Sequence, residues 1–154
     1  MSEPIILRYQ VDGDDFVSCG HAIEDVKRTL KNIGFPASVI RNVSIAMYEG
    51  EINMVIHANG GVAEVVIYED RIVITLTDTG KGIADIEQAM QEGFSTATDA
   101  IRELGFGAGM GLPNMKKYSD NMKIESEVGK GTVVTLEFLL NDSEQNGSEN
   151  EQRI

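Results

Sequence analysis

Apolar residues recur at three- and four-residue steps along the first part of the chain. The repeat runs through Phe16, Cys19, Gly20, Ile23, Val26, Leu30 and Ile33. This spacing predicts an amphipathic helix, with a capping turn at residues 12–15 before it and Gly34 at its end. Residues 5–11 are apolar enough to predict a first strand ahead of that turn.

A second helix is predicted from Pro36 to about Ala58. Proline suits the first turn of a helix, and the Asn-Gly-Gly sequence at residues 59–61 favours its end. Glu49 and Asn53 lie one turn apart within this helix and therefore share a face, although most of their neighbours are apolar. This polar pair sets the second helix apart from the first.

Two hairpins are predicted by pairs of β-branched segments separated by short turns. The pairs are residues 62–68 with 71–77, and residues 122–128 with 132–140. Between the hairpins, residues 80–112 are rich in glycine, serine and threonine and contain one short helical pattern. A further helix continues to Tyr118. A loop of this length inside a domain suggests a functional lid.

Helices interspersed with hairpin-connected strands predict an α+β fold. We expect a two-layer α/β sandwich, in which helices pack on one face of a mixed, mostly antiparallel sheet. The 154 residues suit one domain, which we place at residues 1–140. Residues 141–154 are polar without apolar periodicity and are expected to form a disordered tail.

Composition narrows the possible partners. The formal net charge is −12, and no stretch is rich in Lys or Arg, so nucleic acid is not an expected partner. No apolar run approaches the roughly 20 residues of a membrane helix, so no membrane partner is expected. The N-terminus lacks a signal-peptide pattern, which favours a cytoplasmic location.

The chemistry of Glu49 and Asn53 admits two interpretations. Both side chains could simply find hydrogen-bond partners in the core. Alternatively, the Asn53 oxygen is a hard ligand suited to Mg²⁺, and Glu49 could polarise a nucleophilic hydroxyl or water beside that ion. Glu51 points elsewhere on the helix and is expected to be solvated.

Two glycine-rich segments complete the candidate site. The first, Asp78-Thr79-Gly80-Lys81-Gly82, follows a strand, and there a carboxylate can accept a hydrogen bond from an exocyclic amine such as that of adenine. The second, residues 105–112, precedes a helix. Glycines at a helix N-terminus expose backbone N–H groups to an anion, and a triphosphate is the obvious candidate. The alternatives are an ordinary turn and a flexible linker.

These segments, in this order, resemble the N, G1, G2 and G3 boxes of the GHKL superfamily. Its members, which include gyrase, heat-shock chaperone, histidine kinase and mismatch-repair ATPases, share the Bergerat fold. The resemblance implies that Asn53 binds Mg²⁺, that Asp78 contacts the adenine amine of ATP, and that residues 93–111 form the ATP lid. The other binding residues that it implies are Gly80, Gly82, Ser95, Thr96, Gly107, Gly109, Gly111, Leu112 and Thr132.

Within the superfamily, the chain is most similar to the stand-alone serine kinases of bacterial partner-switching systems. The small size, the run 92–96 and the run 111–116, Gly-Leu-Pro-Asn-Met-Lys, carry this similarity. It implies a serine/threonine protein kinase in which Glu49 is the general base, acting on a serine of an antagonist protein and thereby regulating a sigma factor or a similar partner. Gly50 and Glu51 depart from the small apolar pair common in these kinases, and a glycine within a helix weakens it.

Two alternatives from other classes remain. The chain could be a non-catalytic ATP-binding adaptor whose nucleotide only sets the conformation of the lid. It could also be a detached histidine-kinase-type ATPase domain. That alternative is disfavoured because His21 is expected to lie beside core positions rather than on an exposed phosphoacceptor helix. A homodimer is possible.

Overall fold

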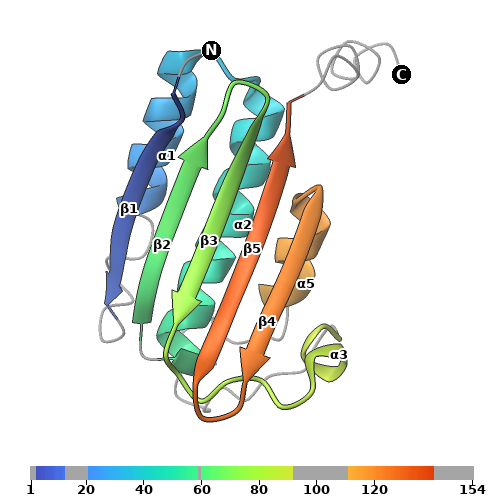
Figure 1. The fold of residues 1–154 in the computed structure, drawn as a ribbon. Helices are drawn as coiled ribbons and strands as arrows, with labels where there is room; N and C mark the ends of the chain where they lie inside the picture. Colours follow the sequence, from blue (N-terminus) through green and yellow to red (C-terminus); the bar gives the residue numbers. More distant parts are fainter. Residues whose placement is uncertain (1–2, 13–20, 59, 92–110, 141–154) are drawn as a thin grey trace.

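Residues 3–12, 21–58, 60–91 and 111–140 are described in the computed structural model, and their strands form one five-stranded sheet in the order β1-β2-β3-β5-β4 (Figure 1). The strands are β1 (Ile5–Asp12), β2 (Gly60–Ile67), β3 (Arg71–Asp78), β4 (Asn121–Glu127) and β5 (Gly131–Leu139). The helices are α1 (His21–Ile33), α2 (Ala37–Ala58), α3 (Ile86–Ala89) and α5 (Gly111–Tyr118).

All four strand pairings are antiparallel, so the expected mixed character of the sheet is wrong in this detail. The reason lies in the connection from β1 to β2. Two antiparallel helices, α1 and α2, return the chain to the end of the sheet where β1 finished (Figure 1), so β2 must run the opposite way. The predicted two-layer α+β architecture is confirmed.

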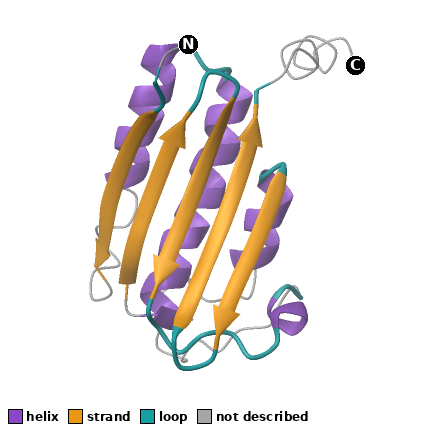
Figure 2. Cartoon of the chain, viewed as in Figure 1, coloured by secondary structure: helices purple, strands orange, loops and turns teal. Residues whose placement is uncertain are grey.

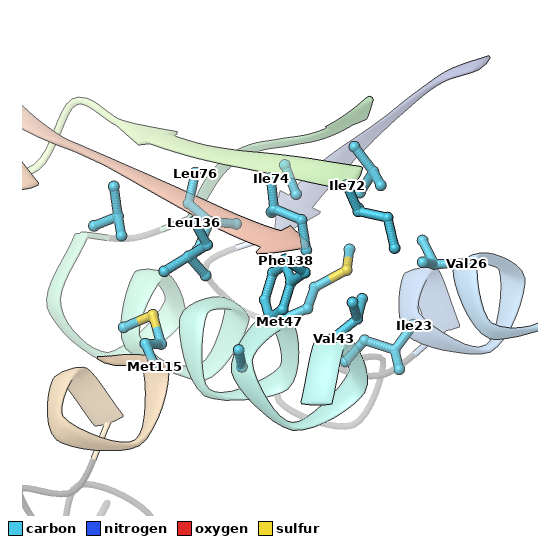
Figure 3. Packing of buried hydrophobic residues seen from close by; sticks show 14 of the residues in the cluster. Ile23, Val26, Val43, Met47, Ile72, Ile74, Leu76, Met115, Leu136 and Phe138 are labelled. Carbon is cyan, nitrogen blue, oxygen red and sulfur yellow. The ribbon is translucent and has the colours of Figure 1, made fainter. Parts of the chain in front are cut away.

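The helices α1, α2 and α5 lie together on one face of the sheet (Figure 2). Alternate residues of the central strands point toward them and are buried, with Ile72, Ile74 and Leu136 fully inaccessible to solvent. On the helix side, Val43 and Met47 of α2 are equally inaccessible. The core therefore lies between the sheet and α2 (Figure 3), which fixes the position of that helix.

The predicted helix ends agree with the structure. Gly34 follows α1, and its N–H donates to the Leu30 carbonyl at 3.1 Å while the N–H of Phe35 donates to the same carbonyl. These bonds satisfy the last turn of the helix. None of the helices in the described ranges is long and apolar enough to cross a bilayer.

Gly50 does not interrupt α2, which runs through it without a break. A Cβ at this position would strike Cδ1 of Leu76 on β3 and would lie 3.4 Å from Sδ of Met115 on α5. The glycine therefore lets α2 approach the sheet and α5 closely. The glycine lowers the helix propensity of α2 at this position, but it permits this tighter packing.

Candidate functional site

Glu49 and Asn53 project from the same face of α2 toward the start of α5. A Cβ at Gly111, the first residue of α5, would lie 3.6 Å from Oδ1 of Asn53 and 3.8 Å from Oε2 of Glu49. A side chain at Gly111 would fill the space beside these two polar groups. Glu49 and Asn53 therefore lie close to Gly111, near the end of the second glycine-rich segment.

Glu49 has an unusual environment for a carboxylate. It is half-buried, and this burial raises its pKa, while a hydrogen bond from the Asn114 side chain opposes the rise. Asn114 lies on α5, three residues after Gly111 and so on the same side of the helix. A carboxylate of raised pKa is a stronger base when ionised, which suits proton abstraction.

Asp78 joins the end of β3 to the start of β5. Its Oδ1 atom accepts hydrogen bonds from the backbone N–H groups of Gly80, at 2.9 Å, and Thr132, at 3.2 Å. Thr132 is 8% exposed. One carboxylate oxygen thus fixes the turn of the first glycine-rich segment, and Asp78 lies beside Thr132, another of the expected binding residues.

A hydroxyl network lies directly behind Thr132. Ser126 Oγ accepts a hydrogen bond from the N–H of Ile83 at 2.7 Å, donates to the Gly131 carbonyl at 3.1 Å, and lies 2.7 Å from Oγ1 of Thr132. Because Ser126 has one hydroxyl hydrogen, which it gives to Gly131, Thr132 is the donor in the last bond. The lone pairs of the Thr132 hydroxyl are then left to accept other hydrogen bonds.

Of these groups, Asn53, Asp78 and Thr132 line one pocket between α2, the ends of β3 and β5, and α5. Its lining residues are Gly50, Asn53, Met54, Ala58, Leu76, Asp78, Gly82, Ile83, Met115, Thr132 and Val134. The cavity that water can enter is about 40 Å³, so the pocket is narrow. Asn53, Asp78 and Thr132 are its polar lining residues and most of the others are apolar or glycine, as in many small-molecule sites.

Glycines bring backbone close to this pocket. A Cβ at Gly80 would lie 2.7 Å from Cα of Ala58 at the end of α2, and one at Gly82 would strike the Glu127 carbonyl oxygen. Leu112 is buried at 6% exposure. The remaining predicted site residues, Ser95, Thr96, Gly107 and Gly109, and most of the predicted lid lie outside the described residues.

The structure corrects the expectation for Glu51. Glu51 was expected to be solvated, but it is only 3% exposed. Burial raises the pKa of Tyr9 most, followed by a hydrogen bond to Asp25, and the charge of Glu51 adds to this rise. Glu51 therefore lies on a buried side of α2, whereas Glu49 faces α5, because residues two apart in a helix do not share a face.

The expectation for His21 is also wrong. This residue is the first of α1 and is exposed, rather than lying beside core positions. It precedes Ile23, with which the buried stripe of α1 begins in the described residues. The helix period placed His21 near the core, but the first turn of α1 leaves it at the surface.

Sequence reasoning gave no role to three residues that contact or line the site. Ser126 hydrogen-bonds to Thr132, Met115 lines the pocket, and the Asn114 side chain lowers the pKa of Glu49. The spacing of Gly111 and Asn114 on a predicted helix is the only available signal for Asn114. Ser126 could have been placed only by knowing the pairing of β4 with β5, in which it is opposite Thr132.

The chain belongs to the histidine kinase-, DNA gyrase B- and HSP90-like ATPase family, whose match covers residues 25–142. Among its relatives, the anti-sigma F factor of Caldanaerobacter subterraneus subsp. tengcongensis is 35% identical over 102 residues, which are 63% of this chain and 68% of the relative. The anti-sigma F factors of Clostridium acetobutylicum and Geobacillus stearothermophilus are 37% and 38% identical, over 63% of this chain and 68% and 67% of their own lengths.

A solved structure shares this fold. The structure of the RsbU and RsbW domains of a Mycobacterium tuberculosis protein matches 88% of this chain and 32% of its own, with a TM-score of 0.60 and 17% sequence identity. The likeness supports the arrangement of an antiparallel sheet with helices on one face. The expected resemblance to the GHKL superfamily is confirmed.

Proposed function

We propose that the protein is an ATP-dependent serine kinase that phosphorylates an antagonist protein and regulates a sigma factor. The observation that carries this proposal is the half-buried Glu49, whose pKa is raised by burial and which lies with Asn53 beside Gly111, next to the pocket that Asn53 and Asp78 line. A positioned base beside a metal ligand and a nucleotide pocket is what phosphoryl transfer to a hydroxyl requires.

The residues present fit Mg-ATP. Mg²⁺ in nucleotide sites commonly uses only one or two protein oxygens, together with phosphates and water. It therefore does not need a cluster of three His, Cys, Asp or Glu side chains, and the described residues contain none. Asn53 would supply that oxygen. Asp78 and Thr132 would hold the adenine, and the small residue Gly111 leaves room for phosphates at the N-terminus of α5.

In the proposed reaction, Glu49 accepts the proton of the substrate serine as the serine oxygen bonds to the γ-phosphorus. The bond between that phosphorus and the β-γ bridging oxygen breaks, and ADP leaves. Mg²⁺ would neutralise the charge of the phosphates. The raised pKa of Glu49 improves proton acceptance, provided that the pH is high enough to ionise it.

The names of the relatives support the proposed partners. Three similar proteins are named anti-sigma F factors, and the chain covers about two thirds of each. A sigma factor is therefore the proposed regulatory partner, and the proposed substrate is an antagonist protein that presents a serine. A homodimer remains part of this proposal, as does a cytoplasmic location.

The experiment that tests the proposal compares wild type with Glu49→Gln. With radiolabelled ATP and a candidate antagonist, we expect the variant to lose about 10²- to 10⁴-fold of the transfer rate, because it lacks the base. ATP affinity should stay within a few fold, because Glu49 does not line the adenine pocket. His21→Ala, on the exposed end of α1, serves as the control and should transfer phosphate normally.

Three results would redirect the proposal. Equal rates of phosphoryl transfer by wild type and Glu49→Gln would show that Glu49 is not the general base. Partner capture that depends on ATP, with no transfer by wild type to any serine, would favour the non-catalytic adaptor. Loss of label in His21→Ala would instead favour the histidine-kinase alternative.

A further inference from the structure

The connection that follows β3 is held against the hairpin of β4 and β5. It runs from the end of β3 past this hairpin to α3 (Figure 1). The N–H of Gly129, in the hairpin turn, donates to the Lys81 carbonyl at 2.9 Å. The N–H of Ile83 donates to Oγ of Ser126 on β4 at 2.7 Å. Ser126 therefore contacts the segment that carries the first glycine-rich motif.

The hydroxyl of Ser126 uses all of its hydrogen-bonding capacity. A serine hydroxyl has one hydrogen to donate and two lone pairs with which to accept. One lone pair accepts the Ile83 N–H, and the hydrogen goes to the Gly131 carbonyl at 3.1 Å, because a carbonyl can only accept. The second lone pair remains, and Oγ1 of Thr132 lies 2.7 Å away. Ser126 therefore accepts the hydrogen of the Thr132 hydroxyl.

This arrangement decides what Thr132 can offer to a ligand. Thr132 lines the pocket together with Asp78. Because the hydrogen of the Thr132 hydroxyl is directed to Ser126, the hydroxyl can only accept a hydrogen bond from a ligand. The ionised carboxylate of Asp78 also only accepts, and its Oδ1 already does so from the N–H groups of Gly80 and Thr132. An exocyclic amine satisfies two such acceptors, whereas a ring carbonyl leaves them unpaired.

We infer that Ser126 sets the base specificity of the nucleotide site, because it fixes the hydrogen of the Thr132 hydroxyl away from the ligand. Ser126 is not among the residues that line the pocket, so it is a positioning residue that acts through Thr132. The ligand class that it favours is a purine nucleotide with an amine on the six-membered ring rather than a carbonyl. This inference rests on the nucleotide site of the proposed function, but binding alone tests it.

The test compares Mg-ATP with Mg-ITP, the inosine nucleotide, which has a carbonyl in place of the adenine amine. Isothermal titration calorimetry gives the Kd of each, and wild type should bind ATP more tightly than ITP. In Ser126→Ala the Thr132 hydroxyl is free to donate to the carbonyl. ITP should therefore bind about 2- to 10-fold more tightly than it binds wild type, the value of one hydrogen bond between neutral groups. ATP affinity should stay within about twofold, because the released hydroxyl can still accept.

A second background separates the hydroxyl from a general disturbance of the loop. Thr132→Val keeps the shape of the side chain but has no hydroxyl. Adding Ser126→Ala to Thr132→Val should leave the ratio of the two Kd values unchanged, because Ser126 acts only through that hydroxyl. An equal change of the ratio in both backgrounds would overturn the inference, since Ser126 would then act through the position of the connection after β3.

Two further variants are controls. Ser126→Thr keeps a hydroxyl at this position and should keep the preference of wild type for ATP. Ser44→Ala removes a hydroxyl that donates to the Ile40 carbonyl at 2.7 Å on α2, outside the pocket lining, and should also leave the preference unchanged. An unchanged preference in Ser126→Ala, or the same loss of preference in Ser44→Ala, would contradict the assigned role.

The binding measurements need no partner protein, so this inference and the proposed function can fail separately. If wild type phosphorylates no serine while Ser126→Ala loses the preference for ATP, the kinase proposal fails and the role of Ser126 is supported. If wild type transfers phosphate but binds ATP and ITP equally, the kinase proposal is supported and the role of Ser126 fails.

Discussion

The ionised carboxylate of Glu49 is stabilised less in the folded protein than in water. This property makes the carboxylate suitable as a base. Burial raises its pKa, and the hydrogen bond from Asn114 recovers only part of the lost solvation. Asp25 is the opposite case. Hydrogen bonds from Tyr9 and Arg28 lower its pKa, so this carboxylate contributes to stability. The two residues should therefore respond to substitution in opposite directions.

The first prediction concerns the stability of Glu49→Gln. Because its pKa is raised in the folded state, the stability contributed by Glu49 is fully present below the ordinary value of 4.5 and is lost as the pH rises through the raised value. We expect the variant to exceed wild type in unfolding free energy at pH 7.5, by a margin that shrinks toward pH 4. Urea denaturation at both pH values measures this margin, and Glu3→Gln, an exposed substitution, is the control.

The second prediction concerns Tyr9→Phe. The Tyr9 hydroxyl donates to Oδ2 of Asp25 at 2.6 Å, and Arg28 donates to Oδ1 at 2.7 Å. A lowered Asp25 pKa stabilises the fold above the ordinary value of 3.8, and that stability is lost as the pH falls through the lowered value. The variant should be less stable than wild type at pH 7, with a difference that decreases toward pH 3. Thermal unfolding measures it.

Tyr68→Phe is the control for this prediction. It removes a hydroxyl but keeps the ring that lies 4.3 Å below the Arg71 guanidinium. Its midpoint should stay close to that of wild type at both pH values. A pH-independent loss in Tyr9→Phe would mean that the hydroxyl acts through packing rather than through the charge of Asp25.

At the level of elements, the site depends on the close approach of β3 and β5 at one end of the sheet. Gly131 begins β5 with φ of +129°, and a Cβ there would strike the Asp78 carbonyl oxygen and lie 2.8 Å from Cα of Thr79. Gly129, in the same hairpin turn, also has a positive φ, of +85°, but nothing lies within 4 Å of its Cβ position. Substitutions at these two glycines therefore separate the cost of backbone strain, which both share, from the cost of close packing, which only Gly131 has.

The third prediction compares Gly131→Ala with Gly129→Ala. Both should lose about 1–2 kcal/mol for an alanine in the left-handed region. Gly131→Ala should lose about 1–3 kcal/mol more from overpacking against Asp78 and Thr79. ATP binding should weaken in Gly131→Ala only, because Asp78 would move. Chemical denaturation and nucleotide titration measure these effects, and equal losses in the two variants would contradict the close contact.

For the whole molecule, ligand binding and folding are coupled, because the pocket brings together residues from both halves of the chain. Asn53 on α2 and Thr132 on β5 line the same cavity, so the unfolded chain cannot form the site. A ligand that binds only the folded state raises the unfolding free energy by mass action.

The fourth prediction follows from this coupling. Mg-ATP at a hundredfold excess over its Kd should stabilise the protein by about 2.7 kcal/mol, which is roughly 5–10 °C in Tm for a domain of this size. In Asn53→Ala, we expect the part of this shift that depends on Mg²⁺ to disappear. Asn42→Ala, on the same helix but outside the pocket lining, is the control. Differential scanning calorimetry with and without Mg²⁺ measures the shift.

Much of the fold could be predicted because local patterns set it. The helix period and the cap at Gly34 placed the end of α1, and turn residues placed both hairpins to within about two residues. The sharing of a face by Glu49 and Asn53 also follows from the helix period. The antiparallel direction of every strand pair could not be predicted this way, because it depends on the path of the intervening helices.

The sequence by itself determined which chemical groups the protein carries and which of them share a helix or a turn, because residue spacing and backbone preferences are local properties. Only the tertiary structure decided that Glu49 is half-buried beside the start of α5, that Glu51 is buried, and that Gly50 lies against Leu76. Burial and cross-element hydrogen bonds depend on which surfaces pack together in three dimensions. That packing turns a carboxylate on a predicted helix into a candidate base.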